Sequence, residues 1–134
     1  MKIKRFENLK VWQLSHKLSI EVSDLVKTFP KDEKYDLADQ MRRSARSIPS
    51  AIAEGFGRFH FNDKLTFYER GRASLKELRN HFAEARENEY VNDKEKRYYD
   101  NMMSEIEFLL NRMMSKIRKH REEYEVQRRS RSRK

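Results

Sequence analysis

The sequence contains no cysteine, only three glycines and only two prolines. Without cysteine the chain has no disulfide, no thiolate ligand for a metal and no cysteine nucleophile. So few turn-forming residues argue against a β-rich fold, in which a turn follows every short strand. No apolar run follows the basic N-terminus or approaches the roughly 18 residues of a membrane span. We therefore expect a cytoplasmic protein that does not enter a membrane.

Positive charge is plentiful and concentrated at the C-terminus. The chain has 31 lysines and arginines against 22 aspartates and glutamates, a formal net charge of +9. Five of the basic residues fall within the last eight positions: Arg128, Arg129, Arg131, Arg133 and Lys134. A basic balance attracts polyanions such as nucleic acid, acidic proteins or anionic lipid. For the rest of the chain, a highly charged and merely solvated surface is the alternative.

Apolar residues recur at intervals of three and four in four segments, which predicts four amphipathic helices of about 20–25 residues each. These segments cover about residues 9–28, 33–54 and 63–87, and a fourth runs from about 93 to a frayed end near 120–125. Short connections force consecutive helices to run antiparallel. The predicted fold is therefore all-α, an antiparallel up-down-up-down four-helix bundle in residues 1–125. A disordered, Arg/Ser-rich tail is expected in residues 126–134.

Polar and turn-forming residues flank these segments and suggest where each helix begins and ends. The predicted N-terminal caps are Asn8 for the first helix, Asn62 or Asp63 for the third, and Asn92 with Glu95 as a capping box for the fourth. Pro30 should end the first helix, because the residue before a proline avoids the α region. Pro49 lies within an apolar stripe that continues beyond it, so a bend is expected and not a break. Gly55 and Gly57 are expected to terminate the second helix.

No constellation of catalytic or metal-binding residues is evident in the sequence. The four histidines are His16, His60, His81 and His120. None follows a glutamate by three residues, which is the spacing that di-iron bundles use. Glu77 and His81 are four residues apart on one helix face, which permits a metal pair but is more typical of a surface contact. Nucleophile elbows and phosphate-binding loops are also missing, so we expect no enzyme activity, no cofactor and no metal.

Residues 40–58 combine arginines with small side chains. Arg42, Arg43, Arg46 and Arg58 lie among serines and alanines, which let a partner backbone approach closely. Arginine suits phosphate and carboxylate contacts because its planar fork can bind them bidentately. One interpretation is a nucleic-acid or subunit contact that these arginines share with the basic tail. The other is close helix packing, with the arginines solvated or paired to acidic neighbours.

Aromatic residues gather between the second and third predicted helices. Phe56, Phe59 and Phe61 lie in or beside this short connection. They suit a subunit interface or the end of the bundle, and stacking on nucleic-acid bases is a further possibility. Trp12 lies off the main apolar stripe of the first helix, on the side of Val26. These five residues are the candidate oligomer interface, with burial inside the bundle as the alternative for Trp12.

Several motifs resemble the four-helix bundle family of 23S rRNA intervening-sequence proteins. They are F-E-N-L-K-V-W-Q at 6–13, F-P-K-D-E at 29–33, Leu37 with Gln40, R-R-S-A at 42–45, S-I-P-S at 47–50 and I-A-E-G-F-G-R at 52–58. The resemblance covers about residues 6–120. Two positions depart from the family pattern: Ala51, where the family usually has Asn, and Ala73-Ser74, where it has Gly-Ser.

The resemblance implies an antiparallel four-helix bundle without enzyme activity. Members, and the related accessory proteins of diversity-generating retroelements, form ring-like homopentamers. The retroelement relatives bind a reverse transcriptase and nucleic acid through a basic surface. By this resemblance, the expected partners are further copies of the chain and RNA or DNA, with a reverse transcriptase or another protein as the alternative partner.

Overall fold

A computed structural model describes residues 2–133, and its regular structure consists of helices. The elements are η1 (Phe6–Asn8), α1 (Lys10–Leu25), η2 (Val26–Thr28), η3 (Lys31–Glu33), α2 (Leu37–Gly57), α3 (Phe61–Glu87) and α4 (Asp93–Ser132), where η marks a 3-10 helix. In this described part, the helix lengths depart from the expected uniformity. Helix α1 has 16 residues and α4 has 40. No helix among residues 2–133 is long and apolar enough to cross a membrane.

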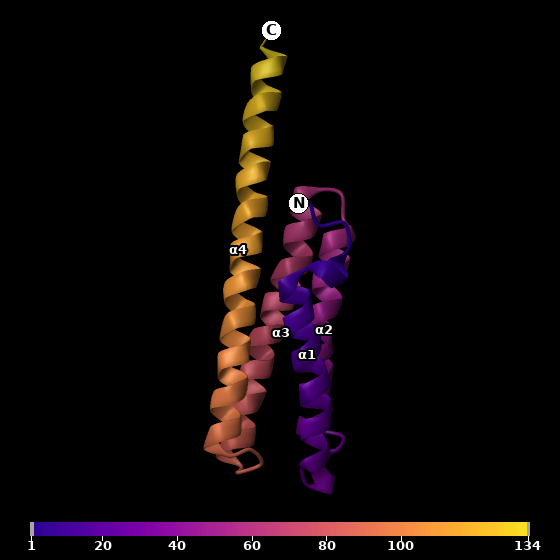
Figure 1. Cartoon of the computed structure of the whole chain (residues 1–134), viewed down its shortest axis with the longest axis vertical. Helices are drawn as coiled ribbons and strands as arrows, with labels where there is room; N and C mark the ends of the chain where they lie inside the picture. Colours follow the sequence, from indigo (N-terminus) through magenta and orange to yellow (C-terminus); the bar gives the residue numbers. More distant parts are fainter. Residues whose placement is uncertain (1, 134) are drawn as a thin grey trace.

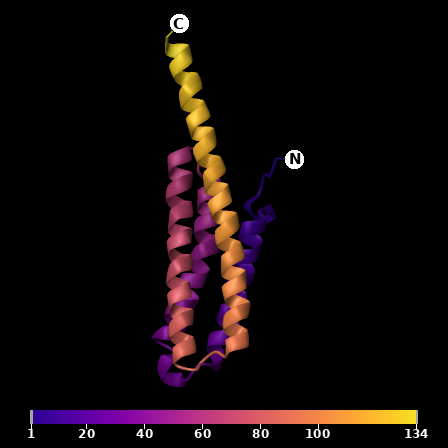
Figure 2. The ribbon, with the colours of Figure 1, turned by 90° about the vertical axis from the view of Figure 1, so that its left-hand side faces the viewer.

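The four α-helices form the predicted up-down-up-down bundle. Helices α1 and α3 run in one direction, and α2 and α4 run in the other (Figures 1 and 2). Helix α2 packs between α1 and α3, and α4 also contacts both α1 and α3. The short α2–α3 and α3–α4 connections produce this order, because they leave no room for a crossover. The all-α, antiparallel prediction is therefore confirmed.

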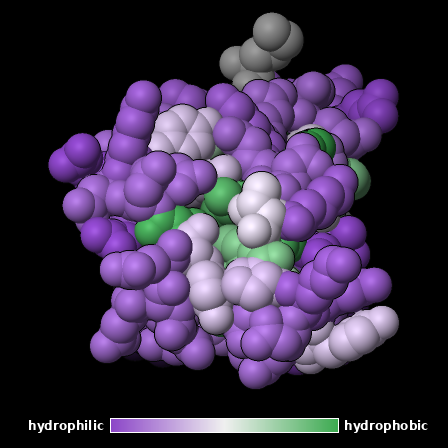
Figure 3. Space-filling model, turned by 90° about the horizontal axis from the view of Figure 1, so that it is seen from below, coloured by the Kyte–Doolittle hydropathy of each residue, from purple (hydrophilic) through white to green (hydrophobic). Residues whose placement is uncertain are grey.

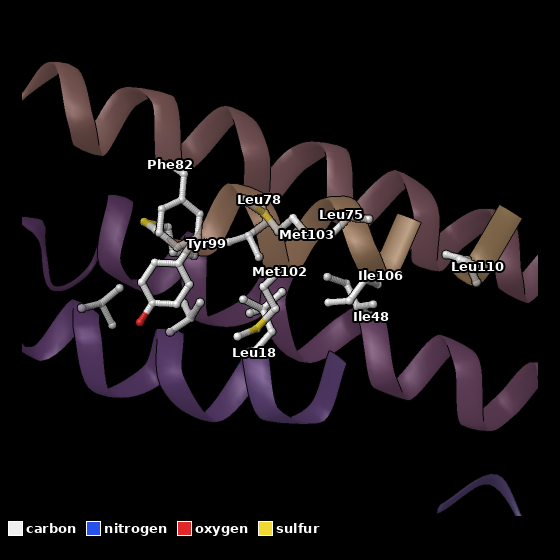
Figure 4. Packing of buried hydrophobic residues seen from close by; sticks show 14 of the residues in the cluster. Leu18, Ile48, Leu75, Leu78, Phe82, Tyr99, Met102, Met103, Ile106 and Leu110 are labelled. Atoms are coloured by element: carbon white, nitrogen blue, oxygen red, sulfur yellow. The ribbon is translucent and has the colours of Figure 1, made fainter. Parts of the chain in front are cut away.

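Side chains from all four helices fill the core (Figure 4). The largest fully buried ones include Leu18, Met41, Ile48, Ile52, Tyr68, Leu75, Leu78, Phe82, Met103, Ile106, Leu110 and Met114. The rings of Phe82 and Tyr99 stack with their centroids 4.8 Å apart. Each fully buried large apolar side chain stabilises the fold by about 1.5–3 kcal/mol relative to exposure. This core accounts for the apolar stripes in the sequence.

Helices α2 and α3 approach each other closely at two glycines. A Cβ atom on Gly55 would lie 2.5 Å from Cε1 of Tyr68, and one on Gly71 would lie 3.4 Å from Cβ of Ala51. Gly55 lies within α2 and makes room for the buried ring of Tyr68 from α3. The prediction that Gly55 ends the helix was therefore wrong. The helix continues past Pro49 and ends at Gly57.

The predicted caps had mixed outcomes. Asn92 and Glu95 form the capping box, with N–H···O distances of 2.9 and 2.8 Å. Asn8 belongs instead to η1, and that extra turn moves the start of α1 to Lys10. Helix α3 begins at Phe61, so Asn62 lies inside its first turn. Its side-chain oxygen accepts a hydrogen bond from Arg121 at 2.9 Å.

Helix α4 extends well past the other three helices. We expected it to fray near residues 120–125 and to lead into a disordered tail, but the helix continues to Ser132. From Asp93 onward the sequence has neither glycine nor proline, and it is rich in Glu, Lys and Arg, which favour helix. The upper part of α4 rises above the bundle in Figures 1 and 2. Residues 122–133 are exposed.

The opposite end of the bundle is hydrophilic around a small apolar centre (Figure 3). A hollow there is lined by Val26, Phe29, Pro30 and Ala38 together with Lys27, Lys31, Lys34 and Arg42. Val26 is 3% exposed and belongs to the hydrophobic core. The prediction that Val26 contacts a second subunit was therefore wrong, because η2 turns its side chain into its own bundle.

Candidate nucleic-acid interface

Three candidate arginines lie on the half of α2 that is nearer to η3. Arg43 Nε lies 3.1 Å from Asp39 Oδ2, so this arginine is paired with an acidic neighbour. Arg42 Nη2 donates a long hydrogen bond of 3.5 Å to the backbone carbonyl of Lys34. Arg46 is exposed beside the groove between α1 and α2. The small residues between these arginines, Ser44 and Ala45, are buried and pack closely inside the bundle, while the arginines remain at the surface.

The fourth arginine of this group, Arg58, follows the end of α2 at the other end of the bundle. Its guanidinium carbon lies 4.5 Å from the centroid of the Phe67 ring, and that of Arg70 lies 4.9 Å from the same ring. Such cation–π contacts contribute about 0.5–1 kcal/mol at exposed sites. The structure therefore separates Arg58 from the other three arginines, although they are close in sequence.

The basic residues of the C-terminus lie on the projecting part of α4. Arg128, Arg129 and Arg131 are exposed within the helix, and Arg133 is at its C-cap. Lys134 lies outside the described residues. At a rise of 1.5 Å per residue, these arginines and the Arg42–Arg46 group are separated by about 30 Å along the bundle. The two candidate groups therefore do not form a single patch.

A recess lies where α4 projects beyond the first residues of α3. It has a volume of about 420 Å³ and is lined by His60, Phe61, Asn62, Asp63, Arg121, Tyr124, Glu125 and Arg128. The rings of Phe61 and Tyr124 meet edge to face with centroids 6.1 Å apart. Arg121 also belongs to this wall through its bond to Asn62. Arg121 and Tyr124 were not among the site residues predicted from the sequence, although both continue the three- and four-residue spacing of the core residues of α4.

The comparisons with known proteins agree with this fold. The family model described as 23S rRNA-intervening sequence protein matches residues 7–112. The chain belongs to this family. The crystal structure of a protein of unknown function from the S23 ribosomal protein family of Bacteroides thetaiotaomicron has the same fold, with a TM-score of 0.73 and 20% identity. That likeness covers 78% of this chain and 95% of the other chain, and no curated protein matches the sequence.

The 23S rRNA-intervening sequence family match ends at residue 112, so it includes residues 60–63 of the recess but not the projecting part of α4 that forms its other wall. Within the matched region, the two departures from the family pattern lie together. Ala51 and Ala73 both line a groove of about 410 Å³ between α2 and α3. Asn at position 51 would present an amide to this groove, and this family member presents a methyl group instead.

The remaining interface candidates lie at the surface or close to it. Trp12 is half-buried, and its ring lies 5.1 Å from that of Phe6 and stacks on His16 at 4.6 Å. It lines a groove of about 590 Å³ between α1 and α2. Phe56 and Phe61 are also half-buried, whereas Phe59 is 89% exposed. The structure therefore leaves four of the five predicted interface residues accessible.

Burial shifts the pKa values of three titratable side chains that pack within the bundle. Burial raises the pKa of Tyr68 and of Tyr99 to about 12 in each case. Burial also lowers the pKa of Lys64, whose ammonium group donates to the carbonyl oxygens of Phe56 at 2.8 Å and Gly55 at 3.3 Å. Lys64 therefore caps the C-terminal end of α2.

The Glu77–His81 pair is a contact between neighbouring turns of α3. His81 Nε2 lies 3.3 Å from Glu77 Oε1, and the histidine is 6% exposed. Among residues 2–133, no group of three or more His, Cys, Asp or Glu side chains is placed to hold a metal. The pair alone offers two ligands, fewer than the three or four protein ligands of zinc sites.

Proposed function

We propose that this protein is a non-catalytic, self-associating helical bundle that binds nucleic acid in the cytoplasm. The observation that carries the proposal is the projecting end of α4. Three arginines lie in the last turns of an exposed helix and a fourth, Arg133, lies at its C-cap, and no acidic residue follows Glu125 in the sequence. A helix presents these guanidinium groups at fixed spacing, and each can bind a phosphate through two parallel hydrogen bonds.

The charge distribution supports a polyanionic partner. Release of counterions from phosphates drives the binding of basic proteins to nucleic acid, whatever the sequence. The tail supplies about half of the net charge of +9, as counted from the sequence. The arginines of α2 offer a second basic surface on the body of the bundle, although Arg43 is already paired with Asp39.

The proposal is tested by measuring the anisotropy of fluorescently labelled RNA and DNA during titration with the full-length protein. We expect saturable binding of at least one nucleic acid at low salt. Failure to bind single-stranded RNA, single-stranded DNA and both duplexes at micromolar protein concentration would reject the nucleic-acid part of the proposal.

Self-association is supported by the groove between α1 and α2. Trp12 and Ile20 line it, and Ile20 is 52% exposed, so apolar surface is available to a second copy of the chain. Aromatic residues of this kind are enriched at the centres of protein interfaces. We expect an oligomer, most simply the homopentamer that the family resemblance implies. Native mass spectrometry tests this, and a monomer at micromolar concentration would contradict it.

The second candidate function is a protein adaptor without affinity for nucleic acid, for example for a reverse transcriptase. Phe108 favours it, because this side chain is 64% exposed on α4, on the face opposite the core. Phe108→Ala should then abolish capture of a protein partner from the native host. If the protein instead binds nucleic acid through its arginines, Phe108→Ala should leave that binding unchanged.

A further inference from the structure

The row of core residues on α4 continues beyond the end of the bundle but changes in character. Within the bundle this row consists of Tyr99, Met103, Ile106, Leu110, Met113 and Ile117. In further steps of three or four residues, it continues as Arg121, Tyr124, Arg128 and Arg131. Residues at this spacing lie on one face of a helix. On the projecting part of α4, three arginines and a tyrosine therefore occupy the same helix face that contacts the other helices farther down.

The α2–α3 connection lies at the end of the bundle beyond which α4 projects (Figures 1 and 2), and residues 60–63 line the recess opposite α4. Arg121 and Tyr124 rest on Asn62 and Phe61, and Arg128 lies farther out in the same recess. His60 also lines the recess, and its ring meets that of Phe59 edge to face at 5.3 Å. Phe59 does not line the recess itself but lies directly beside a residue that does.

Two aromatic rings at this end are open to solvent. Phe59 is 89% exposed and Tyr124 is 57% exposed. An exposed aromatic face can stack on a nucleic-acid base, and such stacking needs a base that is not covered by its neighbours in a duplex. The combination of accessible rings with arginines is the usual composition of a surface that binds single strands.

We propose that this recess binds single-stranded nucleic acid, with Phe59 and Tyr124 stacking on bases while Arg128 and Arg131 contact phosphates. The inference rests on the proposed function and names the form of nucleic acid and the residues that recognise it. The face from Tyr124 to Arg131 is about 10 Å long at 1.5 Å per residue, which matches about three stacked nucleotides at 3.4 Å each.

Acidic residues in the recess determine how the strand lies. Asp63 and Glu125 line it beside the aromatic rings. Phosphates are repelled there, so the bases occupy the inner part of the recess and the backbone follows the outer arginines. A duplex cannot adopt this arrangement, because its bases are paired and stacked inside the helix and cannot stack on the aromatic rings of the protein. The recess therefore selects single strands over duplexes.

The test uses the full-length protein, a labelled 15-nucleotide oligo(dT) and a 15-base-pair duplex at one salt concentration. We expect Phe59→Ala/Tyr124→Ala to weaken oligo(dT) binding at least about fivefold, from the energy of one or more lost stacking contacts. Duplex binding should change less than about twofold, because phosphate contacts are retained. The matched control is Tyr35→Ala, which removes an 86% exposed ring at the opposite end of the bundle and should have no effect.

The outcomes separate this inference from the proposed function. If the unmodified protein binds neither probe, both fail together. If it binds only duplex, or if the double variant binds oligo(dT) as well as the parent protein does, the inference is overturned and the proposed function stands. Displacement of oligo(dT) by poly-glutamate at an equal concentration of charges would also overturn it, because the surface would then recognise acidic chains in general.

Photocrosslinking provides a second measurement that does not depend on affinity. Oligo(dU) that carries 5-iodouracil should crosslink to Phe59 or Tyr124, as mapped by mass spectrometry of the full-length protein. Crosslinks confined to Tyr35 or to residues of α1 would contradict the assignment. An unchanged thermal midpoint in the double variant, whose two rings are exposed, would show that the change in binding is not caused by unfolding.

Discussion

Gly55 and Gly57 lie two residues apart in α2 and have opposite surroundings. Gly55 faces the Tyr68 ring so closely that an added Cβ atom would lie 2.5 Å from Cε1. Around Gly57, apart from its chain neighbours and the adjacent backbone of α2, no described atom lies within 4 Å of the position of such a Cβ. Only the first glycine is therefore required by the packing of the bundle.

Gly55→Ala is expected to destabilise the protein by about 1–3 kcal/mol, the usual effect of overpacking a core. Gly57→Ala serves as the matched control and should leave stability unchanged or raise it by up to about 1 kcal/mol, because alanine favours helix. Urea denaturation monitored by circular dichroism measures both free energies of unfolding. Equal effects of the two substitutions would contradict the packing role of Gly55.

The buried tyrosines make stability depend on pH in the alkaline range. Their pKa values are about 12 in the folded protein, against an ordinary value of 10.0, because burial disfavours the charged phenolate. The contribution of these two tyrosines to the free energy of unfolding should be fully present below pH 10 and fall as the pH rises toward 12. Each such tyrosine contributes a slope of up to about 1.4 kcal/mol per pH unit in this range.

Tyr68→Phe removes one of these two groups and should make the alkaline loss of stability shallower. Denaturation at a series of pH values from 8 to 12 measures the slope. Tyr35→Phe is the control at an exposed position, and its profile should coincide with that of the parent protein. A Tyr68→Phe profile as steep as the parent's would show that burial of Tyr68 does not contribute.

At the scale of the elements, the capping box of α4 is the most specific local prediction from the sequence. Asn92 accepts from the backbone of Glu95, and the Glu95 side chain accepts from the backbone of Asn92. Asn92→Ala should cost about 0.5–2 kcal/mol of stability. Asn101→Ala, at an exposed position within the same helix, should be neutral or slightly stabilising. Thermal denaturation compares them, and equal midpoints for the two variants would refute the capping role.

The sequence predicted the helices better than their ends. Periodic apolar residues place each helix, because only one stripe can face the core. The ends depend on neighbours that are remote in sequence: Asn62 binds Arg121, and Gly55 accommodates Tyr68. Neither contact can be predicted from local sequence. The same holds for the recess, which exists because α4 is longer than the helices beside it.

At the scale of the whole molecule, the arginines that were grouped from the sequence as one nucleic-acid-binding site lie on separate surfaces. Arg42, Arg43 and Arg46 lie toward the η3 end of the bundle, whereas Arg128 and its neighbours lie on the projecting end of α4. Arg58 lies near the latter end but contacts Phe67. A nucleic acid bound by one surface does not reach the other unless it is about 30 Å long. Separate variants of the two groups therefore distinguish their contributions.

The most direct measurement is the salt dependence of binding to a 15-nucleotide single-stranded RNA. Three full-length proteins are compared: the parent, a variant with arginines 128, 129, 131 and 133 changed to Gln, and a variant with arginines 42, 43 and 46 changed to Gln. We expect the logarithm of the parent's association constant to fall linearly with the logarithm of salt concentration. The slope should be about 0.7 shallower for each phosphate contact that the tail variant loses, with a smaller change in the α2 variant. Binding that is absent in the parent, or insensitive to salt, would contradict the proposed function.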